Sequence, residues 1–265
     1  MVFLQLLLHF TPNGRKEAKD RPMFSVALIG PDGAGKTTLT ARLRESATIP
    51  VKCLYMGINI EASNHALPTS RLVAFFKRRK NKNFGVYRCV DDSAPERENA
   101  KRGLSGWLWA IGRLINRLLE EWYRQVLSWC YQIRGYAVVY DRHFLYDFTL
   151  DGIDGEKQSA DKRIHRWLLE RCYPRPHLTI YLDAPAEVLF ARKGEKTLEE
   201  LERRRQAFLQ LRHRAKNFVR IDATRPFDVV YAEVSRLIER EYQNTRPDAG
   251  HGLRWRLQRL GKLFE

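Results

Sequence analysis

The chain of 265 residues is 44% hydrophobic and 29% charged, which suffices for a folded core and excludes an intrinsically disordered protein over most of its length. Its net charge of +16 favours acidic partners, such as nucleotide phosphates, nucleic acid or an anionic membrane surface, without choosing among them. The cysteines lack the short spacing of a zinc site, and reduced thiols in a cytoplasmic protein are the simplest explanation for Cys53, Cys89, Cys130 and Cys172.

The two ends of the chain differ in composition from the part between them. The first ten residues, MVFLQLLLHF, are apolar, but a transmembrane helix needs about 20 such residues, and no basic region or cleavage site marks a signal peptide. We expect this apolar segment and a polar linker over 1–21, one folded domain over 22–243, and a basic amphipathic tail over 244–265. The pattern of the tail favours packing on its own domain or on a second copy, with contact to an anionic membrane as the alternative.

Five short apolar runs predict buried strands, and segments with helical periodicity lie between them. The runs cover 23–30, 51–57, 135–141, 177–183 and 218–222. Strands that alternate with helices predict an α/β fold of three layers, in which a mainly parallel five-stranded sheet is flanked by helices.

The predicted helices cover 35–46, 104–134, 159–173, 196–215 and 227–242, and Pro185 suits the first turn of a further helix. In the longest segment apolar side chains recur every three or four residues. This spacing predicts a face that packs against the core, although a tryptophan-rich face could also line a ligand site. Residues 57–103 predict a loop, a basic helix and a charged insertion without periodicity.

The stretch LIGPDGAGKTTL, at positions 28–39, contains the pattern G-x-x-x-x-G-K-S/T between a predicted strand and a predicted helix. Glycines at these positions let backbone N–H groups curl around phosphate oxygens, and the helix N-terminus adds positive potential. The lysine reaches the β and γ phosphates, and the threonine after it ligates Mg²⁺. The motif predicts that a nucleoside triphosphate and Mg²⁺ are bound by Gly30, Asp32, Gly33, Ala34, Gly35, Lys36, Thr37 and Thr38.

A second carboxylate is expected at the end of a neighbouring strand, where it would hold the water shell of the metal. Two aspartates end apolar runs, Asp141 in GYAVVYD and Asp183 in HLTIYLD. We favour Asp141, because Arg142 beside it could neutralise a transferring or accepting phosphate. An aspartate in the position of Asp183 more often orders the turn that follows it.

Arginines gather after the fourth predicted strand, in ARKGEKTLEELERRRQ. Mobile arginines that close over a transferring phosphoryl group stabilise the charge on its oxygens, so we expect a lid over about 192–206. Arg192 is the predicted catalytic arginine and Arg203 a predicted nucleotide contact, although a solvated charged helix face would look similar. Only one or two of these arginines can face the nucleotide.

Three stretches together resemble the thymidylate kinase family of P-loop nucleoside monophosphate kinases. They are GPDGAGKTT after the first strand, YDRH at a middle strand, and PHLTIYLDAPAEVLFARKGE leading into the lid, and their matching order spans about residues 23–225. The resemblance implies ATP as the phosphoryl donor, Mg²⁺ as cofactor and a nucleotide acceptor. It also implies that Asp32 lies near the sugar hydroxyl of the acceptor, and that Asp141 and Arg142 serve the metal shell and the acceptor phosphate.

The resemblance assigns further residues on the donor side. Some family members carry an arginine in the phosphate loop where Gly33 stands here, and the others supply it from the lid, as Arg192 could. The family usually follows Asp-Arg with tyrosine, whereas this chain has His143, and the segments that grip thymine are not recognisable. The loop that packs on adenine is implied to comprise Asp222, Ala223 and Thr224.

These features favour an ATP- and Mg²⁺-dependent kinase that acts on a nucleoside monophosphate, with thymidylate implied by the resemblance. A first alternative keeps the kinase but changes the acceptor to a nucleoside, a sugar or a lipid-linked group, for which Asp32 or Asp141 would have to act as a base. A second is a non-catalytic nucleotide-binding regulator or a nucleic-acid binder, which dispersed basic residues and the lack of a nucleic-acid motif disfavour. Family members commonly dimerise, so a homodimer through the helix at 104–134 is a further expectation.

Overall fold

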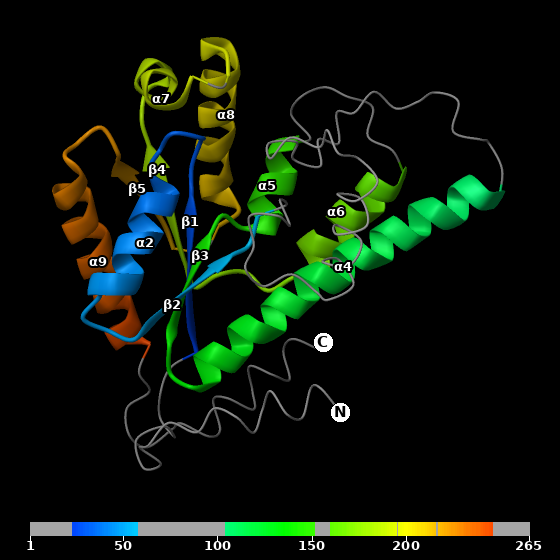
Figure 1. Cartoon of the computed structure of the whole chain (residues 1–265), viewed down its shortest axis with the longest axis horizontal. Helices are drawn as coiled ribbons and strands as arrows, with labels where there is room; N and C mark the ends of the chain where they lie inside the picture. The colour runs from blue at the N-terminus through cyan, green and yellow to red at the C-terminus, as the bar shows by residue number, and fades with distance from the viewer. Residues whose placement is uncertain (1–22, 58–103, 152–159, 195, 216, 246–265) are drawn as a thin grey trace, which may run out of the picture.

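A computed structural model describes residues 23–57, 104–151, 160–194, 196–215 and 217–245 (Figure 1). Its centre is a five-stranded sheet in the order β2-β3-β1-β4-β5, in which all neighbouring strands are parallel. The strands are β1 (Phe24–Ile29), β2 (Val51–Tyr55), β3 (Ala137–Asp141), β4 (Leu178–Asp183) and β5 (Phe218–Asp222). Each strand lies within one of the five predicted apolar runs, so the predicted sheet is confirmed.

The register of the sheet brings the predicted site residues to one edge. Asp141, the last residue of β3, lies opposite Leu28 of β1 on one side and opposite Tyr55 of β2 on the other. Parallel strands all present their carboxyl ends at the same edge, where α/β proteins commonly bind ligands. The loop that follows β1, the end of β3 and the residues after β2 therefore meet at this edge.

Helices cover both faces of the sheet (Figure 1). On one face α2 (Lys36–Ser46) packs beside α9 (Phe227–Asn244), and α4 (Leu104–Ile133), α5 (Phe144–Asp151) and α6 (Ala160–Cys172) form the layer on the other. After β4 the chain forms α7 (Ala186–Lys193), α8 (Leu198–Gln210) and the short 3₁₀ helix η2 (Leu211–His213). These three layers are the predicted α/β architecture.

Two apolar cores hold the layers together, one on each face of the sheet. Val26 and Leu28 of β1 belong to the core beneath α2 and α9, whereas Ala27 and Ile29 belong to the core on the opposite face. Successive side chains of a strand point to opposite faces, so a strand covered on both sides reads as one continuous apolar run. All six residues of β1 are buried for this reason.

The long helix α4 corrects a prediction. Its apolar stripe was expected to face the core, but Ile115, Leu119 and Ile133 are 50%, 56% and 59% exposed. Helical spacing shows that a helix has two unlike faces, but it does not show which face turns inward. Polar partners on the sheet side favour the inward orientation of the polar face here. The buried residues of α4, within the side chains described, are Glu120, Glu121, Arg124, Gln125, Ser128 and Gln132.

The helix α5 was not predicted. It begins directly after His143, and Phe144, Leu145 and Tyr146 are buried within it. Its eight residues are too few to show a helical period in the sequence. Packing stabilises it, and Tyr146 shares a hydrogen bond of 3.0 Å with Thr179 Oγ1 on β4.

Several predictions fall outside the described residues. They concern the apolar segment and linker over 1–21, the loop, basic helix and insertion within 58–103, and the tail beyond 245. The predicted domain boundaries at 21/22 and 243/244 stay predictions. Within the described ranges, no helix combines the length and the apolar character needed to cross a membrane.

Candidate active site

The loop between β1 and α2 passes through three glycines with positive φ, at 152° for Gly30, 87° for Gly33 and 88° for Gly35. A Cβ at Gly33 would lie 2.9 Å from the backbone oxygen of Leu189 in α7, so no larger side chain, arginine included, fits there without movement of the backbone. Gly35 is the N-cap residue of α2, and the first N–H groups of that helix have no partners within it. The loop therefore offers backbone donors at a helix N-terminus, as anion binding requires.

Lys36 is the first residue of α2, and its side chain folds back into this loop. It is 5% exposed, and its Nζ donates hydrogen bonds of 2.7 Å to the backbone oxygens of Gly30 and Pro31. Burial, reinforced by the positive charge of Arg142, lowers the pKa of Lys36 to about 8. The ammonium form still predominates at neutral pH, so the loop holds a positive charge there.

Thr37 and Asp141, the two predicted metal ligands, contact each other. Thr37 Oγ1 donates to Asp141 Oδ2 over 3.0 Å, although the two residues are 104 positions apart. The other carboxylate oxygen of Asp141, Oδ1, is buried and has no hydrogen-bond partner within the described ranges. Mg²⁺ prefers oxygen ligands and is commonly held by one or two carboxylates together with substrate phosphates. The hydroxyl and the unpaired carboxylate oxygen fit such an ion.

Asp32 and Arg142 form a second pair. Arg142 Nη2 donates to Asp32 Oδ1 at 2.5 Å, so the phosphate loop is joined to the residue that follows β3. Burial alone would raise the pKa of Asp32, but the charges of Arg142 and Lys36 and the hydrogen bond outweigh it and hold this pKa well below its usual range. Asp32 is therefore an anion at physiological pH and a weak base.

The backbone of Arg142 has φ 68°, a left-handed conformation that is uncommon for a residue with a side chain. Gly57 packs closely against it, because a Cβ on Gly57 would lie 2.8 Å from Arg142 Cδ and 2.5 Å from the Tyr55 hydroxyl. Arg124 of α4 donates from Nη1 to the backbone oxygen of Gly57 at 3.0 Å. Asp147 of α5 and Asp32 raise the pKa of Arg142, against the effect of burial.

None of Tyr55, Gly57, Arg124 and Asp147 was predicted as a site residue. The signal for Arg124 was present, because it recurs with Glu120, Glu121 and Ser128 at helical spacing on the polar face of α4. Asp147 gave no such signal, since α5 itself was not predicted.

Two neighbouring cations of α7 interact with different parts of the candidate site. Arg192, the predicted catalytic arginine, donates from Nη2 to the backbone oxygen of Ala223 at 2.9 Å, which places it at the predicted adenine loop. Lys193 lies one turn after Leu189, the α7 residue that approaches Gly33, and its charge helps to lower the pKa of Asp32. Lys193 was not predicted as a site residue, because the prediction considered only the arginines around it.

The arginines of α8 are also divided in their contacts. Arg203, the predicted nucleotide contact, is exposed, and its charge acts on Glu200 of the same helix. Arg205 instead binds Asp183, with Nε 2.7 Å from Oδ1 and Nη2 3.1 Å from Oδ2. The structure therefore attaches α8 to the end of β4 and does not direct this arginine toward the phosphate loop.

Asp183 is saturated by protein donors. Besides Arg205 it accepts from Arg220 Nε at 2.8 Å and from the Tyr181 hydroxyl at 2.9 Å. Burial raises its pKa, but these donors outweigh burial and the pKa is lowered. A carboxylate occupied in this way supports the preference for Asp141 as the metal ligand and a structural role for Asp183.

The predicted adenine loop is an ordered turn directly after β5. Asp222 Oδ1 accepts from the backbone N–H of Thr224 at 2.9 Å and from the Thr224 hydroxyl at 2.6 Å. The N–H of Ala223 donates to the backbone oxygen of Asp183 at 2.7 Å. The loop thus lies beside the end of β4, with Arg192 against it.

No family model matches the chain. It is 29% identical over 225 residues to the probable thymidylate kinase of Staphylothermus marinus and 27% identical over 231 residues to that of Archaeoglobus fulgidus. Each of these matches covers 81% of this chain and 94% of the relative. Over most of its length this chain is therefore similar to thymidylate kinases.

Two further likenesses are shorter or more distant. The thymidylate kinase of Thermosipho africanus is 31% identical over 77 residues, which are 26% of this chain and 38% of the relative. A solved structure of deoxyadenosine kinase from M. mycoides, with the products dCMP and a flexible dCDP bound, overlaps 82% of this chain and 99% of its own at 12% identity and a TM-score of 0.47. The stretches of this chain that carry the resemblance to thymidylate kinases lie at the same edge of the sheet.

Proposed function

We propose that the protein is an ATP- and Mg²⁺-dependent kinase that transfers the γ-phosphoryl group of ATP to a nucleoside monophosphate, with thymidylate as the first acceptor to test. One observation carries this proposal: the ion pair between Asp32 and Arg142 holds a partly exposed arginine directly beside the phosphate loop. An arginine in that place suits an acceptor that already bears a phosphate. The names of the two relatives aligned over most of the chain point the same way.

The residues of the loop bind and orient the donor. Backbone N–H groups of the loop and of the α2 N-terminus hydrogen-bond phosphate oxygens, and the Lys36 ammonium neutralises charge on the transferring group. Thr37 and Asp141 Oδ1 would hold Mg²⁺, which when bound neutralises phosphate charge. Phosphoryl transfer needs little covalent chemistry from the protein, so these positions and charges account for most of the expected rate.

The electrostatics of Asp32 favour a phosphate acceptor over a hydroxyl acceptor. A nucleoside or sugar hydroxyl would need a base of suitable pKa to take its proton. Asp32 is poorly suited to that task, because Arg142 and Lys36 hold its pKa well below the usual range. A nucleoside monophosphate presents a phosphate oxygen that is already ionised and needs no such base.

An acceptor panel with Mg²⁺ and ATP tests the proposal. We expect turnover of at least one nucleoside monophosphate, dTMP among those assayed, and loss of turnover in Lys36→Ala and Asp141→Asn. Arg236→Ala is the matched control, because Arg236 is exposed on α9 away from the sheet edge. Turnover of unphosphorylated nucleosides alone would contradict a monophosphate kinase, and wild-type activity in Lys36→Ala would contradict phosphoryl transfer by this loop.

We also propose that the protein acts as a cytoplasmic homodimer through the outer face of α4. The exposed Ile115 and Leu119 lie one turn apart and make this face apolar. Leu119→Glu should shift the mass measured by light scattering from dimer to monomer. Val229→Glu, at an exposed position of α9, is the matched control and should not change the mass. Contact of the tail at 246–265 with an anionic membrane is the alternative association, and vesicle co-sedimentation would reveal it.

A further inference from the structure

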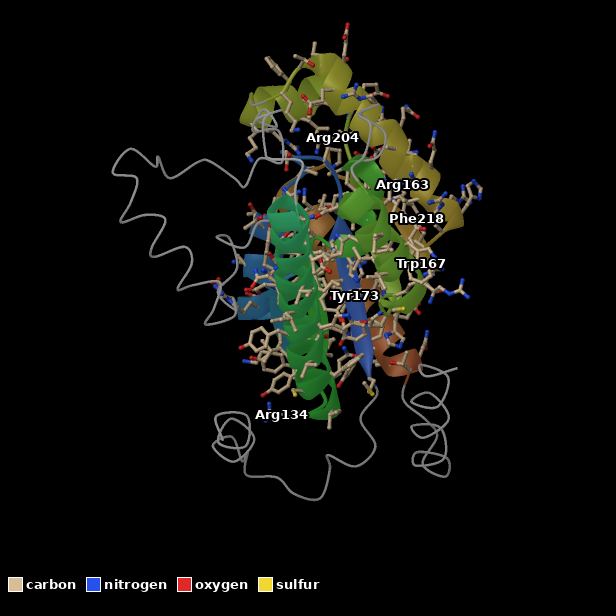
Figure 2. All side chains as sticks on the ribbon, turned by 90° about the vertical axis from the view of Figure 1, so that its right-hand side faces the viewer. Arg134, Arg163, Trp167, Tyr173, Arg204 and Phe218 are labelled. Atoms are coloured by element: carbon tan, nitrogen blue, oxygen red, sulfur yellow. The ribbon has the colours of Figure 1, made fainter. Side chains whose placement is uncertain are left out.

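The outer face of α6 presents two large apolar side chains to solvent. Ile164 and Trp167 are 51% and 57% exposed, and residues three positions apart are neighbours on a helix surface. The inner face of α6 is buried against α4, where His165 Nε2 lies 2.9 Å from Glu121 Oε2. Figure 2 shows Arg163 and Trp167 on the side of α6 that turns away from α4.

Arginines lie on both sides of this apolar pair. Arg163 and Arg171 are exposed, four residues before and four residues after Trp167. Residues with this spacing follow one line along a helix. Arg175, which is also exposed, comes shortly after the end of α6. The outer face of α6 therefore combines apolar and cationic side chains.

The residues around η2 add positive charge beside α6. Arg175 Nη1 donates to the backbone oxygen of Arg214 at 3.3 Å, and Arg214 and Arg212 are both exposed. Glu170, an exposed acid of α6, lies 3.9 Å from Arg214. We call the exposed side chains of α6 from Arg163 to Arg171, together with Arg175, Arg212 and Arg214, the basic face. Its exposed side chains comprise five arginines and one glutamate, so the basic face has a net positive charge.

A phospholipid bilayer with anionic headgroups complements both parts of the basic face. Guanidinium groups bind phosphate through paired N–H donors, and the surface potential of anionic lipids attracts clustered basic residues. Tryptophan is enriched where membranes meet water, and an aliphatic side chain beside it gains by leaving water. The net charge of +16 adds attraction at longer range.

Other partners complement only one part of the basic face. A second copy of the chain would bring like charges together, and the cores of protein interfaces are depleted in charged residues. Single-stranded nucleic acid is commonly held by bases stacked on successive aromatic rings along a groove. On the described part of the basic face, Trp167 supplies the aromatic ring, and its neighbour Ile164 is aliphatic. These side chains favour a lipid surface over a strand of bases.

We propose that the basic face binds the surface of an anionic phospholipid membrane, with Ile164 and Trp167 inserted among the headgroups and the arginines paired with lipid phosphates. The inference is independent of the proposed function. It places the contact on the folded domain, whereas the alternative considered above uses the tail at 246–265. Because α2 and α9 cover the opposite face of the sheet, they would turn away from the membrane (Figure 1).

Co-sedimentation of the full chain with lipid vesicles tests the proposal. The vesicles contain phosphatidylglycerol and phosphatidylcholine in equal parts, or phosphatidylcholine alone. We expect binding to the anionic vesicles, less binding at higher salt, and little binding to phosphatidylcholine. Absence of wild-type binding to the anionic vesicles would overturn the inference. Lys36→Ala should bind them as the wild type does, so loss of turnover and loss of membrane binding can be told apart.

Paired substitutions with equal charge locate the contact. Arg163→Gln combined with Arg171→Gln should weaken vesicle binding by about 25-fold, which is about fivefold per arginine near an anionic surface. Arg236→Gln combined with Arg240→Gln removes the same charge from exposed positions of α9, and it should change binding by less than about twofold because that helix faces away. All four positions are exposed, so thermal melting should stay unchanged. Equal weakening by the two pairs would overturn the inference.

The fluorescence of Trp167 provides a local measurement. Trp167→Phe should reduce the blue shift that vesicles induce in the tryptophan emission, whereas Trp255→Phe, in the tail, should keep it. Trp167→Ser should in addition weaken binding by about tenfold, since an apolar contact is lost. A blue shift that disappears in Trp255→Phe and persists in Trp167→Phe would assign the contact to the tail and overturn the inference.

An oligonucleotide control separates the two anionic surfaces. Fluorescence anisotropy with labelled single-stranded DNA and RNA should show weaker binding than the anionic vesicles do at the same salt concentration. Tighter binding of an oligonucleotide, weakened by the same pair of substitutions in α6, would identify nucleic acid as the partner and overturn the inference.

Discussion

Arg142 donates a 2.5 Å hydrogen bond to Asp32, which joins the end of β3 to the phosphate loop between β1 and α2. The two residues are 110 positions apart and meet because β1 and β3 are parallel neighbours. The bond fixes the direction of the Arg142 side chain before any acceptor arrives. A group that is held in place in advance loses little freedom on binding, which is a recognised source of affinity.

Asp32→Asn should impair acceptor use more than ATP use. The substitution keeps the shape of the side chain but removes the charge that holds Arg142, so we expect the KM for the acceptor to rise by about tenfold, since a bond between charged groups is lost. Steady-state kinetics with each substrate varied would measure this. Asp228→Asn, exposed on α9, is the control. A rise confined to the KM for ATP would show that Asp32 serves the donor instead.

Lys36 should set an upper pH limit on the capture of ATP. Its pKa in the free enzyme is about 8, below the usual 10.5, so the ammonium form is lost as pH rises through that value. We expect kcat/KM for ATP to fall above this pH, approaching about tenfold per pH unit, because kcat/KM reports groups of the free enzyme. A pH profile in a constant ionic-strength buffer would measure it. A profile that stays flat to pH 10 would contradict this assignment.

Substitution of Lys193 and substitution of Arg192, the two neighbouring cations of α7, should change different kinetic constants. The charge of Lys193 acts on Asp32 at the phosphate loop, whereas Arg192 is hydrogen-bonded to the predicted adenine loop. Lys193→Ala should therefore lower kcat, by about ten- to a hundredfold if its charge acts in the transition state. Arg192→Ala should mainly raise the KM for ATP. Restoration of kcat in Lys193→Arg would support a charge effect, and the reverse pattern for the two alanine variants would restore Arg192 as the catalytic residue.

His143 should make the fold sensitive to acid. It is fully buried among Tyr140, Tyr146 and Tyr173, and burial lowers its pKa from 6.5 to about 3. Below pH 6.5 the unfolded chain binds a proton that the folded chain refuses, so stability is lost as pH falls from there toward the folded value. The free energy of unfolding should fall by at most about 1.4 kcal/mol per pH unit from this residue.

Denaturant titrations between pH 7 and 4.5 would measure that effect. His143→Phe should reduce the slope of stability against pH, because phenylalanine cannot take up the proton. His213→Asn, exposed on η2, is the control and should keep the wild-type slope. Equal slopes for wild type and His143→Phe would contradict the role of His143.

Local sequence patterns predicted the sheet, and they also singled out the phosphate loop and Asp141, which the structure brings together. Strands buried on both faces read as apolar runs, and Asp141 was found because it ends such a run. The phosphate loop is contiguous, so its motif contains its own geometry. The pairing of Asp32 with Arg142 depends on the order of the strands in the sheet, which places β1 beside β3. Only the resemblance to thymidylate kinases indicated that both residues belong to one site.

The contacts made by α4, α5 and α7 near the phosphate loop could not be predicted from local sequence patterns. The spacing in α4 is equally helical on both of its faces. Only the partners, His165 of α6 for Glu121 and the backbone of Gly57 for Arg124, decide that these two residues turn inward. Asp147 lies on a helix too short to show a period. Lys193 is one cation among several in a row, and only the close approach of Leu189 to Gly33 identifies the face of α7 that meets the loop.

The inward polar face of α4 also determines how tightly its position is defined. Apolar surfaces attract without direction, so a helix packed by them can slide or rotate a little at small cost. Hydrogen bonds such as those of Ser128 and Arg124 fail when their geometry shifts by a fraction of an ångström or some tens of degrees. The rotation and the height of α4 above the sheet are thus set by directional bonds, which gives this helix a fixed register relative to β3 and to the residues that follow β2.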